Sequence, residues 1–426
     1  MLVLFFLASW PLALSALVSE LLTFGLGLTG FLFLLGLTDW TLTPSRRRLV
    51  VSRHGGSNWQ QGEERRVRIR IENTSASTTV IEIEDPPPAP LEAERERLVV
   101  RLSGSRHQQA TYRVRAARRG TGHWSGFAIR ARGPLGLVGR AWWQSDLVAC
   151  RVLPELFKLP TVGRPVRGKT PRGRRSFVPE RGDFDRLREY CLGDDPRVID
   201  WKATSRRRSL VVRQFVPPRN ERLMLVLDVG YAMGAPTGER TKLDHACSAA
   251  AALATAAIRA GDEVGLVTFA GEIVTTLGPG HGMRHLRRLL QELADSAAKT
   301  SASLVPPALA RARRLARRRA LVVLITDVAD EREAVRLRES LQPRGARALP
   351  ICVLISDECL NRWARDEPET IRDAYRRVAS GTVLAERERA LGALRRGGVL
   401  TVDGAAGQLS SELLDTYARI KARALV

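Results

Sequence analysis

The sequence predicts a mixed fold class in three parts: an N-terminal transmembrane helical hairpin, a small β-sandwich and a doubly wound, Rossmann-type α/β domain. Three observations predict it. The first 37 residues carry one charged side chain, Glu20. Residues from about 49 to 155 alternate apolar and polar side chains in short runs. From residue 221 onward, near-continuous apolar runs are separated by segments long enough for helices, which is typical of a parallel sheet covered on both faces.

The N-terminal apolar segment is too long for one membrane span. A single helix over it would be about 55 Å long, whereas the hydrocarbon core of a bilayer is about 30 Å thick. A break at Ser19-Glu20 gives two spans, residues 2–18 and 21–37. The basic residues Arg46–Arg48 that follow favour the cytoplasmic side. We therefore predict two transmembrane helices within residues 1–40, in a multi-pass protein of the cytoplasmic (inner) membrane whose soluble domains face the cytoplasm.

The alternative for this segment is a cleaved signal peptide. It lacks a basic n-region, and the apolar block continues past any plausible cleavage point. Cysteine usage agrees with a cytoplasmic placement, because the five cysteines are scattered without a C-x-x-C pair. They predict neither a disulfide framework nor a zinc ribbon, and a reducing compartment fits them best.

The net charge of +23 is carried almost wholly by arginine. Such a charge favours an anionic partner such as nucleic acid or a lipid surface. Alanine, arginine, glycine and leucine are abundant throughout, however, which also fits the coding bias of a GC-rich genome. The charge therefore does not assign a partner by itself.

Residues 45–157 predict the β-sandwich domain. Runs such as RRVRIRIEN, TVIEIED and RLVVRLS have the period of two that is typical of strands, with Gly, Pro, Asn and Ser between them. Residues 158–220 follow as a linker and signature segment. Within them the Pro-, Gly- and Arg-rich stretch 163–182 is a candidate for binding anionic lipid or nucleic acid. Phe177 is its one aromatic residue, which argues against specific nucleic-acid recognition.

Residues 221–426 predict the doubly wound domain. The runs LMLVLDV, EVGLVTF, ALVVLITDV, LPICVLI and GVLTVD are expected to be its buried parallel strands. The segment LDHACSAAAALATAAIRA is expected to form a helix whose alanines let it lie close on the sheet. No P-loop, dinucleotide-binding glycine fingerprint or nucleophile elbow is present, so we predict no enzyme.

One segment before this domain carries a dense pattern, RGDFDRLREYCLGDDPRVIDWKATSRRRSLVVRQF. It resembles the signature of the bacterial domain-of-unknown-function family 58 (DUF 58). Asp183 and Ser205 depart from the pattern, which has Glu and Ala there. The matching residues are Gly182, Phe184, Leu187, Arg188, Tyr190, Gly193, Asp194, Arg197, Ile199, Asp200, Trp201 and Arg206. The resemblance implies paired N-terminal membrane helices, a β-rich segment and a von Willebrand factor A-like domain.

Domains of the von Willebrand factor A type usually bind protein partners, often through a divalent metal held by a D-x-S-x-S motif and a further aspartate. Here Asp228 is kept, but Gly230 and Ala232 stand at the serine positions; Asp327 takes the place of the further aspartate. We therefore predict a degenerate metal site with no cofactor, serving as a partner-docking surface; a magnesium ion held weakly by the two aspartates is the alternative. The simplest alternative is that both aspartates lie at strand carboxyl ends, near the switch point where ligands of any kind bind in such sheets.

Three interpretations compete for residues 189–207. As a structural clasp, Tyr190, Ile199 and Trp201 would be buried against the sheet while the acids pair with arginines. As a catalytic centre, Asp194, Asp195 and Asp200 would supply an acid and a base, but no histidine lies nearby. As a nucleic-acid grip, the arginines at 206–208 would act with Trp201, but the other basic residues of the segment are matched by nearby acids. A surface that contacts a partner is the remaining alternative. We favour the clasp, with Asp195 before Pro196 as a helix N-cap.

Together these observations predict a non-enzymatic, membrane-anchored adaptor. The resemblance implies a partner of the MoxR type of AAA+ ATPase, in the assembly or activation of other proteins. The lipid bilayer is the second expected partner, and nucleic acid is not expected. The alternative function is a basic peripheral binder of anionic lipid or nucleic acid through residues 163–182.

Overall fold

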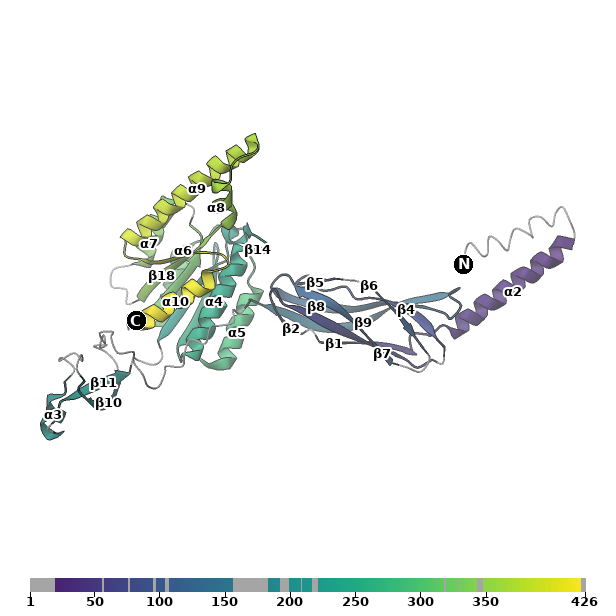
Figure 1. The fold of residues 1–426 in the computed structure, drawn as a ribbon, viewed down its shortest axis with the longest axis horizontal. Coiled ribbons are helices and arrows are strands. Elements are labelled where there is room, and N and C mark those ends of the chain that lie inside the picture. Colours follow the sequence, from purple (N-terminus) through teal and green to yellow (C-terminus); the bar gives the residue numbers. More distant parts are fainter. Residues whose placement is uncertain are drawn as a thin grey trace. The chain divides into compact units, whose positions relative to one another are not determined.

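The structure, a computed structural model, describes residues 20–422 except positions 56, 76, 95–96, 104–106, 156–182, 192–198, 208, 217–220, 318, 329 and 343–347 (Figure 1). The chain divides into two compact units, Met1–Leu153 and Pro154–Val426. The finer division into four segments that the sequence suggests stays a prediction.

The first unit contains two β-sheets, with strand orders β1-β3-β7-β5 and β2-β9-β8-β4-β6. Alternation drives their formation: in β3 the side chains of Val67, Ile69 and Ile71 are buried, and the arginines between them lie on the other face. Residues of both sheets share one core around Trp59, Trp124 and the other inward side chains. The strands are β1 (Leu49–His54), β2 (Asn58–Gln60), β3 (Glu64–Asn73), β4 (Thr79–Glu84), β5 (Leu91–Ala93), β6 (Arg97–Leu102), β7 (His107–Ala116), β8 (Gly120–Arg132) and β9 (Gly139–Leu153).

The sheets of this unit are preceded by a single described helix, α2 (Glu20–Leu42). Over the described part of the chain, no helix combines the length and the apolar content that a bilayer crossing needs. The predicted transmembrane hairpin and the multi-pass inner-membrane localisation are therefore wrong. The first predicted span, residues 2–18, lies outside the described residues, and α2 continues beyond residue 37, where the second span was expected to end.

Asp39 explains why α2 continues. Its carboxylate is fully buried and accepts hydrogen bonds from the backbone N–H groups of Leu135, Leu137 and Val138 at 2.9, 2.8 and 2.8 Å. These groups belong to the turn between β8 and β9, which this contact joins to the last turns of the helix. A buried carboxylate is tolerated only where such donors surround it. The end of α2 is thus packed against protein in the first unit.

The second unit contains a six-stranded sheet of order β16-β15-β12-β17-β18-β19. Neighbouring strands are parallel except β16, which runs antiparallel at one edge, whereas the sequence predicted parallel strands alone. The strands are β12 (Arg222–Asp228), β15 (Glu263–Phe269), β16 (Ile273–Gly280), β17 (Ala320–Thr326), β18 (Ala348–Ser356) and β19 (Leu400–Ala405). β12, β15 and β17 are buried almost throughout, because helices cover both of their faces.

Helices form a layer on each face of this sheet (Figure 1). Residues of α6, α7 and α9 share a core with alternate residues of the strands, while α4 packs on the sheet between α5 and α10. Nine successive residues of α4, Ala246–Ala254, are buried, and its alanines make this close packing possible. The helices are α4 (Lys242–Arg259), α5 (Gly282–Asp295), α6 (Val305–Ala316), α7 (Glu331–Leu341), α8 (Glu358–Arg365), α9 (Ile371–Arg396) and α10 (Leu409–Ala422).

The signature segment forms a small element of its own. Strands β10 (Asp183–Glu189) and β11 (Val211–Val216) pair antiparallel, and the short helix α3 (Trp201–Arg207) lies between them in the chain. Asp200 caps α3, because its Oδ1 accepts a hydrogen bond from the N–H of Ala203 at 3.0 Å. The expected cap, Asp195, lies outside the described residues.

Candidate functional site

Asp228 and Asp327 lie at the same edge of the six-stranded sheet. Asp228 is the last residue of β12 and Asp327 directly follows β17, its parallel neighbour. The chain leaves β12 toward β15 on one side, and later strands add on the other side through β17. This is the switch point of a doubly wound sheet, where ligands commonly bind beyond the strand carboxyl ends. We call this edge the β12/β17 rim. It comprises Asp228, Gly230, Ser303, Thr326 and Asp327, with Lys242 and Arg387, whose side chains contact Asp327.

The Asp228 carboxylate is buried and held by hydroxyl and amide donors. Its Oδ1 accepts hydrogen bonds from the N–H of Gly230 at 2.7 Å and from the Ser303 hydroxyl, and its Oδ2 accepts one from the Thr326 hydroxyl at 2.6 Å. Burial raises the pKa of Asp228 above its ordinary value, with a smaller contribution from the charge of Asp327; the three hydrogen bonds act in the opposite direction. The carboxylate is thus fixed in orientation from both oxygens.

Gly230 is required at its position by the close approach of Ser303. A Cβ atom on residue 230 would lie 2.1 Å from the Ser303 hydroxyl oxygen and 3.1 Å from Asp228 Oδ1. The glycine that replaces a motif serine therefore makes room for a hydroxyl from another loop. Ala232 contributes nothing to the carboxylates and is exposed in the 3₁₀ turn η2 (Tyr231–Gly234).

Asp327 is neutralised by two cations. Its Oδ2 lies 2.6 Å from Lys242 Nζ, and its Oδ1 accepts hydrogen bonds from Arg387 at 3.1 Å and from the N–H of Val328 at 3.0 Å. Arg387 also donates to Asp403 at 2.7 Å. The side chains of Lys242 and Arg387 are each 11% exposed, so water screens these pairs little.

This arrangement does not fit a divalent metal ion. Magnesium needs near-octahedral oxygen ligands, whereas both oxygens of Asp327 already face protein cations. Within the described residues, no three His, Cys, Asp or Glu side chains are grouped so that they could hold a metal.

Sequence reasoning missed four residues of the rim: Ser303, Thr326, Lys242 and Arg387. Ser303 comes from the loop before α6, where no motif spacing points to it. Thr326 immediately precedes Asp327 and was the one local signal available. Lys242 and Arg387 lie 85 and 60 positions from Asp327 in the chain, so no local pattern reveals their contact.

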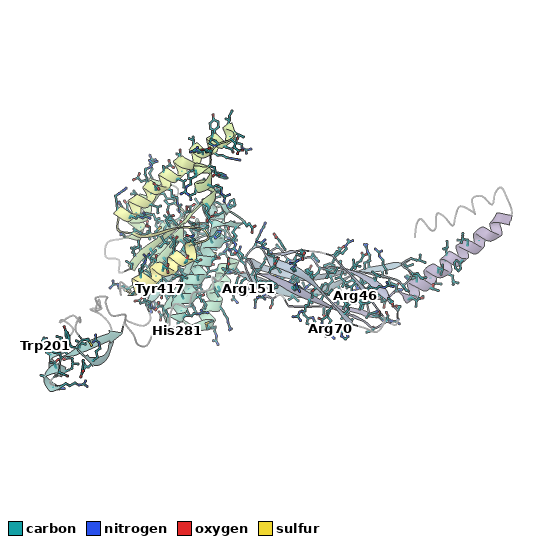
Figure 2. The ribbon with its side chains drawn as sticks, viewed as in Figure 1. Arg46, Arg70, Arg151, Trp201, His281 and Tyr417 are labelled. Atoms are coloured by element: carbon teal, nitrogen blue, oxygen red, sulfur yellow. The ribbon has the colours of Figure 1, made fainter. Side chains whose placement is uncertain are left out.

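The clasp predicted for residues 189–207 is wrong in its central residue. The side chain of Trp201, labelled in Figure 2, is 68% exposed, and α3 has no buried residue. Tyr190 and Ile199 are half-buried. The buried side chains next to this segment are those of Val211 and Val212 in β11, the strand that pairs with β10 and, at Val212, with Ile199.

The other signature residues are placed as follows. Arg188 is half-buried on β10 and donates to the Glu189 carbonyl oxygen at 3.1 Å, while Arg206 is exposed in the last turn of α3. Gly193, Asp194 and Arg197 lie outside the described residues, as does the basic stretch 163–182. Binding of anionic lipid or nucleic acid by that stretch stays a prediction.

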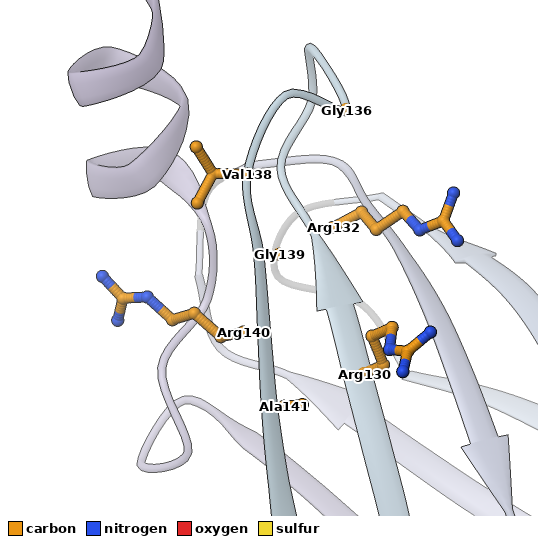
Figure 3. A pocket seen from close by; sticks show the side chains of 7 residues that line it. All are labelled: Arg130, Arg132, Gly136, Val138, Gly139, Arg140 and Ala141. Atoms are coloured by element: carbon orange, nitrogen blue, oxygen red, sulfur yellow. The ribbon is translucent and has the colours of Figure 1, made fainter. Parts of the chain in front are cut away.

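A basic cavity of about 270 Å³ lies beside the turn between β8 and β9 in the first unit (Figure 3). Its arginines do not converge on one point: Arg140 points to one side of the hairpin, and Arg130 and Arg132 point to the other. Arg140 lies 4.6 Å from the ring centre of Trp40, and Arg132 pairs with Glu82 at 2.7 Å. These arginines therefore serve local contacts.

The second unit exposes apolar side chains on α8 and the N-terminal half of α9. Arg387 of α9 contacts Asp327 at the rim, and Ile371, which begins α9 sixteen positions earlier, lies about 24 Å from it along the helix axis. Figure 1 shows α9 continuing past the sheet with α8 beside it. We call residues 358–386 the α8–α9 arm.

Comparisons with known proteins find a match to the model of a family whose function is unknown. Residues 186–374 match the family model described as "Protein of unknown function DUF58". An uncharacterized protein of Mycobacterium tuberculosis and one of Mycobacterium bovis are each 31% identical over 143 residues, which is 33% of this chain. The match spans 45% of the length of these relatives, less than half.

Among solved structures, the conserved hypothetical protein BatB from Bacteroides thetaiotaomicron is similar over 47% of this chain and 100% of its own, with 12% identity and a TM-score of 0.29. The ASH / PapD-like domain of human CEP192 is similar over 25% of this chain and 85% of its own, with 8% identity and a TM-score of 0.19. Neither likeness bears on function at these scores.

Proposed function

We propose that this chain is a non-enzymatic protein-interaction module that docks a partner protein on the α8–α9 arm and the adjoining β12/β17 rim. One observation carries the proposal: a row of large apolar side chains stands exposed on the arm. Ile371, Tyr375 and Val378 are 80%, 74% and 70% exposed. Such rows, where they extend over several residues, mark interaction sites more often than isolated exposed residues do.

The spacing of these residues suits a helix that binds in a groove. Positions i, i+4 and i+7 lie on one side of α9 and repeat as the anchors of an amphipathic helix do. Trp363 of α8 is 43% exposed, and Arg376 of α9 lies over its ring at 5.8 Å. The arm thus brings tryptophan, tyrosine and arginine side chains together, the types that most often dominate binding energy at interfaces.

The residues that follow Gly230 and Ser303 of the rim in the chain add further exposed apolar side chains. Tyr231 is 74% exposed and Leu304 is 55% exposed. Their backbones are held in place: the N–H of Tyr231 donates to Ser301 at 3.1 Å, and that of Leu304 donates to Ala270 at 2.8 Å. A surface that is ordered before binding loses less conformational entropy when the partner docks.

The carboxylates of the rim support docking over catalysis. A general acid or base must exchange a proton with its substrate. Both oxygens of Asp228 and both oxygens of Asp327 instead accept hydrogen bonds from protein groups. We assign these side chains to shaping and fixing the rim.

For the partner we propose an AAA+ ATPase of the MoxR type, with the pair acting in the assembly or activation of other proteins. The support is the resemblance of residues 182–206 to the DUF 58 signature, a family whose members are associated with such ATPases. The match of residues 186–374 to the family model agrees with this support.

Binding of a purified MoxR-type ATPase from the same organism to the full chain tests the proposal, with affinity measured by biolayer interferometry. Tyr375→Ala combined with Val378→Ala should weaken binding by about tenfold or more, since truncating an interface anchor typically costs more than 1 kcal/mol. Val99→Ala is the matched control, because Val99 is 64% exposed on β6 in the first unit. No binding, or equal binding by the two variants, contradicts the proposal.

A further inference from the structure

The β12/β17 rim presents oxygen atoms of the type that divalent cations prefer. Asp228 and Asp327 supply carboxylates, and Ser303 and Thr326 supply hydroxyls, at the carboxyl ends of neighbouring strands. Magnesium and manganese favour carboxylate and hydroxyl oxygens. Since the contacts at this rim do not fit a metal ion, a group of the protein has to supply the balancing positive charge.

Lys242 supplies that positive charge. Its Nζ lies 2.6 Å from Asp327 Oδ2, and the lysine is only 9% exposed. Arg387 reaches Asp327 Oδ1 from another helix, so each oxygen of this carboxylate faces one cation. Two fixed positive charges at the carboxylate repel a metal ion, while they provide the neutralisation that a metal would provide.

The position of Lys242 in its helix gives an independent reason to regard it as a fixed part of the rim. Lys242 is the first residue of α4, directly after the N-cap Thr241. The N-terminus of a helix carries partial positive charge and disfavours a cation. A buried lysine is unfavourable there unless an acid offsets both the helix dipole and the loss of hydration, and Asp327 is that acid.

We propose that the Lys242 ammonium group, assisted by Arg387, is the resident cation of the β12/β17 rim. The rim keeps one electrostatic state without any metal ion. On the proposed function above, partner docking on this rim is consequently independent of divalent metal. The assignment of the cation itself does not depend on any partner.

Metal titration of the full chain without partner tests the assignment. Mn²⁺ binding is followed by electron paramagnetic resonance, and melting temperature is recorded with Mn²⁺ and with EDTA. The wild type should show no Mn²⁺ binding at the rim and equal melting temperatures in both solutions. Lys242→Ala should bind Mn²⁺ at least about tenfold more tightly than the wild type, because a unit charge near the carboxylates is gone. That gain should be lost in Lys242→Ala combined with Asp327→Asn.

Lys299→Ala is the matched control, because Lys299 is an exposed lysine whose backbone N–H bonds to Val229 near the same rim. It should behave as the wild type does. If Lys242→Ala does not fold, Lys242→Gln keeps most of the side-chain length and gives the same comparison. Mn²⁺ binding by the wild type that Asp327→Asn abolishes, or no gain in either folded Lys242 variant, overturns the assignment. The result stands apart from the docking experiment, in which no rim lysine is changed.

Discussion

Arg387 is expected to hold the α8–α9 arm at the rim, and Arg387→Met tests this role. The guanidinium donates to Asp327 at 3.1 Å and to Asp403 at 2.7 Å, and so connects α9 to the residue that follows β17 and to β19. Methionine keeps much of the side-chain volume and removes both hydrogen bonds. The change therefore isolates the ionic contacts from the packing of α9.

The cost follows from the burial of the three side chains. Removing one partner of a fully buried ion pair costs about 3–5 kcal/mol. Asp327 and Asp403 are 15% and 22% exposed, and Lys242 still neutralises Asp327 in the variant. Water and the remaining cation thus recover part of the loss, and we expect a destabilisation of about 2–3 kcal/mol.

Hydrogen exchange measured by mass spectrometry on peptides from α9 and β19 is the suitable assay, because a chain of two units need not unfold in one step. If exchange there proceeds by local opening, it should be about 30- to 150-fold faster in Arg387→Met. Arg389→Met is the matched control: Arg389 is exposed on the same helix and donates within it, to the Ala385 carbonyl oxygen. Equal exchange in the two variants would refute the ionic tie.

Three further predictions concern other parts of the chain. Asp39→Asn should destabilise the first unit by about 2–3 kcal/mol and speed amide hydrogen exchange in residues 135–138. The reason is that the side-chain amide of asparagine cannot accept all three hydrogen bonds that the carboxylate accepts. Thr41→Ala is the control and should change little, because Thr41 is exposed. Trp201→Ala should lower the free energy of unfolding in urea by less than about 1 kcal/mol, since Trp201 is 68% exposed. A loss of about 3 kcal/mol or more would support the clasp, because it is the cost typical of removing a buried aromatic side chain. Burial raises the pKa of Glu221 to about 7, and the charge of Asp262 adds to this effect. Between pH values of about 4.5 and about 7 the folded state therefore keeps a proton that the unfolded state releases. The free energy of unfolding consequently falls as the pH rises through this range. Glu221→Gln should therefore melt above the wild type at pH 8 and level with it at pH 5, and equal differences at the two pH values would contradict the shift.

Hydrophobic periodicity in the sequence determined the regular elements. The five apolar runs predicted from residue 221 onward contain or overlap β12, β15, β17, β18 and β19, and the alternating runs RRVRIRIEN, TVIEIED and RLVVRLS correspond to β3, β4 and β6. Such patterns are local, because a residue's burial on a strand is set by its own position in the repeat. β16 escaped prediction, since its sequence IVTTLGPG at the sheet edge is only partly buried and shows neither pattern.

Long-range contacts decided the rest. The apolar content of residues 21–37 predicted a membrane helix that ends at residue 37, but the turn between β8 and β9 supplies the N–H groups that bind the buried Asp39 carboxylate. The composition of residues 189–207 predicted a buried tryptophan, yet Trp201 begins α3, a short helix in which no residue is buried. In both cases the side chain's environment depends on residues that the local sequence does not contain.

By itself, the sequence determined that Asp228 and Asp327 lie at the carboxyl ends of buried strands, because strand ends are readable from apolar runs. Only the tertiary structure decided that these strands are neighbours, that Ser303 and Thr326 hold one carboxylate, and that Lys242 and Arg387 neutralise the other. The physical reason is the distance along the chain between interacting residues. The burial of a strand residue follows from its position in a local repeat, whereas Arg387 and Lys242 lie 60 and 85 positions from Asp327 and contact it only in the folded chain.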